Sequence, residues 1–330
     1  MNKYKVISLF SGCGGSDLGT LGGFTYLKKK YKRLSTEIVH ASDIDAKAVG
    51  TYNKNLSLFK HKASVADIRT LSFERNMSDI VIGGFPCQNF SSVNPRKAPH
   101  QRENQLFWEL ARVVEEVQPK VFVGENVKGF FRLHGGKYFE MAKSEFERLG
   151  YNVSFSLVNV SEFGIPQLRE RLILVGIKKD LNKVFVFPSP THSQIPSGKL
   201  KSLVPLEAVI ESLLPSDDKY YFSRRAVQGV KNAKPNMKRA LAQNLKKPCL
   251  TITSHLAKVS LNSRDPVLLV DSQKEIYRRF TPREAARIQS FPDNFIFEGS
   301  ESSAYRQIGN AIPPVYFWHL MNKIINDLSS

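Results

Sequence analysis

Gly83-Gly84-Phe85-Pro86-Cys87-Gln88-Asn89-Phe90-Ser91 directly follows an apolar run at 79–82 that predicts a buried strand. The glycines and the proline predict a rigid turn at the edge of a sheet, and this turn carries Cys87. A rigid turn positions a reacting atom well, so Cys87 is a candidate nucleophile. A single cysteine is more often a small buried hydrophobe, but here the polar Gln88 and Asn89 follow at once.

The composition is that of an ordinary globular chain with a strong basic excess. The chain has 330 residues, of which 42% are hydrophobic and 24% charged, enough for one large or two modest domains. Its 48 Lys and Arg against 30 Asp and Glu give a formal net charge of +18. Nucleic acid is the usual partner of so basic an enzyme, although a lysine-rich proteome would give the same excess.

The cysteines and the N-terminus indicate where the chain resides. Cys13, Cys87 and Cys249 are widely spaced and form no C-x-x-C pattern, which argues against disulfides and against a metal site. A reducing cytoplasm fits this usage. The apolar run at 6–10 is too short for a signal peptide or a membrane span, so a cytoplasmic location is expected.

The first half of the chain alternates short apolar runs with amphipathic stretches. The alternation predicts a mostly parallel, doubly wound α/β sheet of the Rossmann-like kind. Strands are expected at 5–10, 37–42, 79–82 and 120–123, helices at 17–27, 45–53, 106–117 and 138–149, and an edge hairpin at 151–160 and 171–177.

The sequence pattern changes after residue 177, where prolines recur and the periodic spacing of apolar residues is lost. Residues 219–247 hold nine Lys and Arg and no Asp or Glu, interleaved with aromatic and amide side chains. This mixture suits phosphate and base-edge contacts, with a solvated basic face as the rival interpretation. The candidates for reading bases are Arg224, Arg225, Gln228 and Asn232. Periodicity returns with a capping box at Thr281, a helix that ends at Phe291-Pro292, and a terminal helix at 314–328.

A glycine-rich turn, Phe10-Ser11-Gly12-Cys13-Gly14-Gly15-Ser16, follows the first strand and opens the first helix. Glycines there let a ligand approach the backbone, although the turn alone would equally admit NAD or FAD. Carboxylates with apolar neighbours, which could hold ribose hydroxyls and cover an adenine, end the second strand and lie in the third βα loop. Together these residues outline an adenosine pocket: Asp43, Ile44, Asp67 and Ile68.

Further polar residues follow the fourth strand and begin a later one. Because the carboxyl ends of parallel strands share one crevice, Glu125 should face Cys87 as a general acid faces a nucleophile. In Gln167-Leu168-Arg169-Glu170-Arg171 the alternate residues share a face, so both arginines should point into the same cleft. Surface ion pairs with Glu162 or Glu170 are the alternative for these arginines.

These motifs, in this order, resemble the cytosine carbon-5 DNA methyltransferases over nearly the whole chain. The residues that carry the resemblance are 10–19, 85–88, 125–127, 167–171, 278–289 and 307–314. The resemblance implies S-adenosyl-L-methionine as cofactor, bound by Phe10, Ser11, Gly12, Gly14, Gly15, Asp43, Ile44, Asp67, Ile68, Pro86, Leu106 and Asn310. It implies catalysis by Cys87, Glu125, Asn126, Arg169 and Arg171 on a cytosine flipped out of double-stranded DNA.

The same resemblance implies a domain plan. Residues 1–179 would bind cofactor and carry the chemistry, 180–275 would form a smaller target-recognition domain, and 276–330 would return to the catalytic domain. The polar loop at 91–104 would close over the base, and the expected DNA contacts near it are Gln88, Ser91, Arg96 and Lys97.

Several alternatives stay open. A monomer acting beside a separate restriction endonuclease fits the resemblance. A tRNA cytosine methyltransferase is a rival from the same family, and a catalytically silent DNA-binding relative is another. A nicotinamide-dependent oxidoreductase is the rival from a different class.

Overall fold

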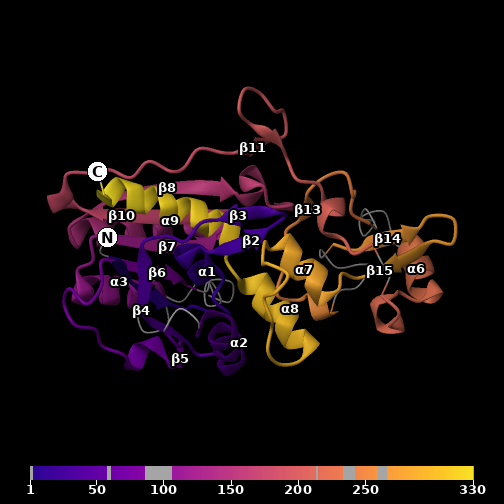
Figure 1. Ribbon diagram of the computed structural model, residues 1–330, viewed down its shortest axis with the longest axis horizontal. Helices are drawn as coiled ribbons and strands as arrows, with labels where there is room; N and C mark the ends of the chain where they lie inside the picture. The colour runs from indigo at the N-terminus through magenta and orange to yellow at the C-terminus, as the bar shows by residue number, and fades with distance from the viewer. Residues whose placement is uncertain are drawn as a thin grey trace.

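The computed structural model describes residues 3–57, 61–85, 106–212, 215–232, 242–258 and 266–329. At its centre lies a seven-stranded sheet in the order β5-β4-β1-β6-β7-β10-β8 (Figure 1). Its strands are β1 Tyr4–Leu9, β4 Thr36–Asp43, β5 Ser64–Val65, β6 Ile80–Gly84, β7 Val121–Val127, β8 Tyr151–Asn159 and β10 Glu170–Lys178. The first five pair in parallel, and β10 runs antiparallel to both β7 and β8. The predicted doubly wound fold is therefore confirmed, together with its antiparallel edge.

Side chains along the central strands alternate between two apolar layers, as a pleated strand requires. Val6 and Ile82 face one core, which is covered by α1 and α9, whereas Ile7 and Val81 face the other, which is covered by α3 and α5. The helices of this region are α1 Gly15–Leu21, α2 Ala46–Leu56, α3 Leu106–Val117, α4 Lys128–Arg132, α5 Lys137–Arg148 and α9 Pro314–Ser329. Helices thus cover both faces of the sheet. The carboxyl ends of its parallel strands are the part left open for a binding site.

Two local predictions for the first half of the chain differ from the structure. The first helix ends at Leu21 rather than at 27, because Gly22 and Gly23 adopt positive φ angles of 62° and 82°. A hairpin follows, with β2 Phe24–Tyr26 paired to β3 Lys29–Tyr31. The fourth predicted strand continues to Val127 instead of stopping at 123, since its polar end still pairs with β10.

A small core of Val227, Val267 and Tyr277 lies within the segment after residue 178, which contains short elements (Figure 1). These elements are β11 His192–Ser193, β12 Lys201–Ser202, α6 Arg224–Lys231, β13 Cys249–Leu250, β14 Leu268–Asp271 and β15 Ile276–Arg278. Single 3₁₀ turns connect elements throughout the chain: Ile68–Thr70, Leu133–Gly136, Val160–Phe163, Lys179–Leu181, Leu206–Val209, Asp218–Tyr220 and Leu256–Lys258. A short parallel pair joins this region to the main body, between β13 and β9 Gln167–Leu168.

The last part of the chain returns to the main body through α7 Pro282–Ile288, α8 Glu301–Asn310 and α9. The predicted capping box at Thr281 is confirmed, since its hydroxyl and the Glu284 carboxylate bond each other's backbone N–H. Helix α7 ends at Ile288, earlier than the predicted stop at Phe291-Pro292. Among the helices in the described residues, none is long and apolar enough to cross a membrane.

Candidate active site

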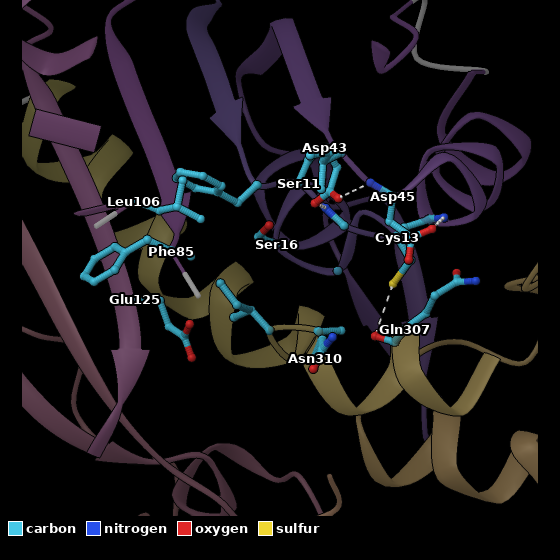
Figure 2. Close-up of a pocket in the computed structure, with 18 of the residues that line it drawn as sticks. Ser11, Cys13, Ser16, Asp43, Asp45, Phe85, Leu106, Glu125, Gln307 and Asn310 are labelled. Carbon is cyan, nitrogen blue, oxygen red and sulfur yellow. Dashed lines mark hydrogen bonds between the residues drawn. The ribbon is translucent and has the colours of Figure 1, made fainter. Parts of the chain in front are cut away.

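A cavity of about 630 Å³ opens where the carboxyl ends of β1, β4, β6 and β7 meet. Parallel strands bring their ends to one edge, so residues far apart in the sequence share this space (Figure 2). Ten of the residues predicted for the cofactor line it: Phe10, Ser11, Gly12, Gly15, Asp43, Ile44, Asp67, Ile68, Leu106 and Asn310. Pro86 lies outside the described residues, as does Cys87.

Asp43 stands at the end of β4 and is fixed by backbone donors. One carboxylate oxygen accepts from Gly12 N at 2.8 Å, and the other accepts from Asp45 N at 2.9 Å. Burial raises the pKa of Asp43, and these backbone hydrogen bonds oppose the rise. Ile44 beside it is 69% exposed, which leaves an apolar surface beside the carboxylate at the cavity wall.

The glycine turn is shaped by close packing. Phe10 and Gly12 have φ angles of 54° and 53°, so the chain turns sharply as it leaves β1. Gly14 has a φ of 88° and lies behind the cavity wall, where a Cβ atom would come within 2.7 Å of Leu56 and 2.9 Å of Tyr52. The sequence placed Gly14 among the cofactor contacts, whereas in the structure this glycine lets α2 pack against the turn.

Glu125 and Arg171 form an ion pair on the opposite side of the cavity from Asp43 (Figure 2). Arg171 Nε donates to Glu125 Oε1 at 3.0 Å, and their side chains are only 15% and 12% exposed. Burial lowers the pKa of Arg171, while the Glu125 charge raises it. The alternative ion pairs with Glu162 or Glu170 do not form, since Arg171 contacts Glu170 only through its backbone carbonyl.

Asn126 and Arg169 fasten the backbone around this pair. Asn126 is 1% exposed and donates to the Phe85 carbonyl at 3.3 Å, which ties β7 to the end of β6. Arg169 is 2% exposed and donates to the carbonyls of Ile252 at 3.2 Å, Gly309 at 3.1 Å and Ala311 at 3.2 Å. Arg169 lines the cavity, yet both of its terminal nitrogens already hold backbone carbonyls on two other segments of the chain.

Several lining residues were not predicted from the sequence. They come from the glycine turn and the first turn of α1, from the N-cap of α2, from the end of β6 and the residue after it, from α3 and from the C-terminal segment: Cys13, Ser16, Asp45, Gly84, Phe85, Glu109, Arg306, Gln307, Gly309, Ala311 and Ile312. Many of these residues lie within or next to the glycine turn and the motif at 307–314, so those two motifs were the signal that could have identified them. Cys13 donates to the Gln307 carbonyl at 3.8 Å, and burial raises the pKa of its thiol to about 12.

The remaining predicted site residues divide into two groups. Gln88, Ser91, Arg96 and Lys97 lie outside the described residues. Arg224, Arg225, Gln228 and Asn232 are exposed on or directly after α6, and Gln228 Nε2 donates to Asn232 Oδ1 at 3.3 Å. Lys219, which begins the basic segment, forms ion pairs with Asp217 and Glu301. In the parts of the chain that the structure describes, no three His, Cys, Asp or Glu side chains gather as metal ligands would.

Comparisons with known proteins agree with this arrangement. The model of the family described as C-5 cytosine-specific DNA methylase matches residues 4–326. The Neisseria gonorrhoeae type II methyltransferase M.NgoFVII is 32% identical over 95% of this chain and 84% of its own. The Fusobacterium nucleatum type II methyltransferase M.FnuDI is 33% identical over 94% and 90%. The crystal structure of the S. pombe Dnmt2 methyltransferase shares the fold, with a TM-score of 0.73 at 20% identity over 99% of this chain and all of that one.

The family match therefore covers the glycine turn, the Glu125–Arg171 pair and the C-terminal segment that closes the cavity. The chain belongs to the C-5 cytosine-specific DNA methylases and is a DNA (cytosine-5-)-methyltransferase.

Proposed function

We propose that this enzyme transfers a methyl group from S-adenosyl-L-methionine to carbon 5 of a cytosine in double-stranded DNA, with Cys87 as the nucleophile. The observation that carries the proposal is the Glu125–Arg171 pair, which faces the same cavity as Asp43. One side of the cavity thus offers a carboxyl group and a guanidinium for a polar ring, and the other offers a carboxylate and apolar surface for a nucleoside.

The cavity residues fit the cofactor. Asp43 presents a backbone-fixed carboxylate that would accept from the ribose hydroxyls, and the exposed Ile44 would cover the adenine. On a neighbouring loop, Asp67 and Ile68 would likewise offer a carboxylate and an apolar side chain to the nucleoside. Phe10, Leu106 and Asn310 also line the cavity. When bound, S-adenosyl-L-methionine supplies an electrophilic methyl group on its sulfonium.

The chain's own residues would prepare the cytosine for that methyl group. The Cys87 thiolate would bond to carbon 6, which moves a ring electron pair toward carbon 5. Glu125 would place a proton or hydrogen bond at ring nitrogen 3, where negative charge develops, and Arg171 would hold the carbonyl oxygen. After carbon 5 gains the methyl group and loses its proton, the carbon–sulfur bond breaks and the thiolate returns.

Arg169 and Asn126 have supporting parts in this scheme. Arg169 fixes strand β9 and the start of β10 to Ile252 and to the end of α8, so it holds Arg171 in place from behind. Asn126 holds the end of β6, from which the chain runs toward Cys87. Small displacements of reacting groups cost large factors in rate, so these contacts would serve catalysis without touching the base.

Recognition of DNA is assigned to residues 180–275. Within them, Arg224, Arg225, Gln228 and Asn232 present guanidinium and amide groups to solvent on or next to α6. Gln88, Ser91, Arg96 and Lys97 would contact the DNA near the flipped base. Because the relatives above are named type II methyltransferases, we assign the enzyme to a restriction-modification system. We further propose that it acts in the cytoplasm as a monomer.

The decisive experiment offers labelled S-adenosyl-L-methionine with duplex DNA, with tRNA, or with neither, and measures methyl transfer. Bisulfite sequencing of DNA from cells that express the enzyme then gives the target sequence. Transfer to duplex DNA is expected. Transfer to tRNA alone would favour the RNA-modifying rival, and DNA binding without transfer would favour the silent relative.

A further inference from the structure

Asp17, in the first turn of α1, is a carboxylate for which the scheme above has no use. It is 0% exposed, and it accepts three hydrogen bonds from hydroxyl groups. Ser8 donates at 2.9 Å, Ser16 at 3.0 Å and Tyr52 at 3.1 Å, so the carboxylate joins β1, α1 and α2. A buried carboxylate is costly to keep, which makes its position informative.

The position is directly behind the cavity. Ser16, which donates to Asp17, lines the cavity and lies between its Glu125 side and its Asp43 side (Figure 2). A single hydrogen bond of 3.0 Å, from the Ser16 hydroxyl, therefore separates the Asp17 carboxylate from the cavity wall. At so short a separation, a charge in a buried region acts on groups inside the cavity.

Asp17 has no cationic partner among the residues that the structure describes. Four carboxylates that line the cavity have arginine partners, in the pairs Asp45–Arg306, Asp67–Arg69, Glu109–Arg112 and Glu125–Arg171. Within the described residues, the Asp17 carboxylate is held by hydroxyl and backbone donors and forms no ion pair. Neutral hydroxyls hold the carboxylate in place but leave its charge unbalanced, and charge interactions fall off slowly in a buried region of low dielectric.

The two forms of the cofactor differ by one charge. S-adenosylmethionine carries a sulfonium, and the S-adenosylhomocysteine that remains after methyl transfer carries a neutral thioether; the rest of the two molecules is the same. We propose that Asp17 is a specificity residue whose uncompensated negative charge favours the sulfonium cofactor over its neutral product. This inference rests on the cofactor assigned under the proposed function, and it gives the enzyme a means to release product.

The test measures the dissociation constants of both ligands by calorimetric titration, without DNA and without turnover. Asp17→Asn keeps the shape and removes the charge, so the preference for S-adenosylmethionine should fall by about fivefold or more. Tyr52→Phe removes one hydrogen bond and no charge, so it should change both dissociation constants by a similar factor and leave their ratio intact.

A second measurement uses the titration of Asp17 itself, because burial raises its pKa to about 6. The preference of the wild-type enzyme should decline between pH 8 and pH 5, and that of the Asn variant should decline less. The titratable groups around Asp17 are Cys13, Tyr52 and Asp43. Since all three remain in the variant, the difference between the two pH profiles isolates Asp17.

The outcomes are distinct. A ratio that Asp17→Asn leaves unchanged, or equal weakening of both ligands, would overturn the electrostatic role and make Asp17 a structural residue. If the wild-type protein binds neither ligand, the cofactor assignment itself fails, and that result is separate from any effect of the substitution.

Discussion

Glu125 and Arg171 meet side by side at a distance of 3.0 Å, although they come from strands that run in opposite directions. The register pairs Arg171 with Val127 and Ile173 with Glu125, so the two side chains are diagonal neighbours across β7 and β10. The reversal of β10 therefore brings the guanidinium to the carboxyl end of β7. A parallel strand at this place would not give this diagonal pairing.

Arg171→Ala should reduce kcat by about 10²-fold or more, because a donor aimed at developing charge is lost. Cofactor affinity should change little, since Asp43 lies across the cavity from Glu125, the partner of Arg171. Single-turnover methylation and cofactor titration measure the two effects separately. Arg148→Ala, which removes an exposed arginine paired with Glu145, is the matched control. Equal losses in both measurements for Arg171→Ala would point to a general structural defect.

Cys87→Ala should abolish methyl transfer and leave DNA binding largely intact, because the nucleophile is lost while the phosphate contacts remain. DNA that carries 5-fluorocytosine at the target should trap the wild-type enzyme covalently, since fluorine cannot leave as a proton does. Denaturing electrophoresis reports the trapped complex. Cys249→Ala is the control, because burial raises the pKa of that thiol and makes it a poor nucleophile. Turnover by Cys87→Ala would refute the thiolate mechanism.

Asp43→Ala should weaken S-adenosylmethionine binding by roughly 1.5–3 kcal/mol, the value of a charge-assisted hydrogen bond. The substitution also frees the N–H groups of Gly12 and Asp45, so the glycine turn should loosen as well. Calorimetric titration gives the affinity. Asp45→Ala serves as a comparison, since Asp45 already pairs with Arg306. An affinity that Asp43→Ala leaves unchanged would remove this carboxylate from the cofactor site.

Asp17→Asn should increase the free energy of unfolding at pH 7.5 by about 1–3 kcal/mol. The pKa of Asp17 is about 6 in the folded protein, because burial raises it from the ordinary value of 3.8, so the folded state binds the proton more tightly. The contribution of Asp17 to stability is thus fully present below pH 3.8 and is lost as the pH rises through about 6. Denaturant titrations at several pH values should show the advantage of the Asn variant shrink toward acid pH. A constant advantage at all pH values would contradict this assignment.

Arg224→Gln together with Arg225→Gln should weaken DNA binding and reduce its salt dependence by about one unit of slope for each lost phosphate contact. An arginine that reads a base edge would instead lose about 1–3 kcal/mol of discrimination. Binding of cognate and altered duplexes over a range of salt concentrations separates the two roles. Lys137→Gln with Lys143→Gln removes the same charge from α5 as a control.

A swap of residues 180–275 tests the larger domain assignment. Grafted into a relative with a different target, this segment should transfer its own methylation pattern, because the motifs on either side have catalytic or cofactor roles. An active chimera that keeps the specificity of its host would show that sequence recognition lies elsewhere in the chain.

The sequence by itself determined the doubly wound sheet, its parallel strands and many residues of the cavity wall. Alternating apolar residues and strand-end glycines and carboxylates are local signals, so Asp43, Asp67 and Glu125 could be placed before the structure was known. The family motifs added Asn310, which no local pattern predicts. The hairpin at β2 and β3 was missed because three-residue strands carry too little periodicity to distinguish them from a helix end.

Only the tertiary structure decided how these charges are partnered. Arg169 and Arg171 share one face of a strand, yet Arg169 is occupied by three backbone carbonyls and Arg171 pairs with Glu125. Asp17 looks like an ordinary first-turn carboxylate in the sequence, but folding buries it behind the cavity without a cation. Ion pairing and burial depend on residues that are distant along the chain, so a local pattern can place a charged side chain at a site without showing which charge, if any, will balance it.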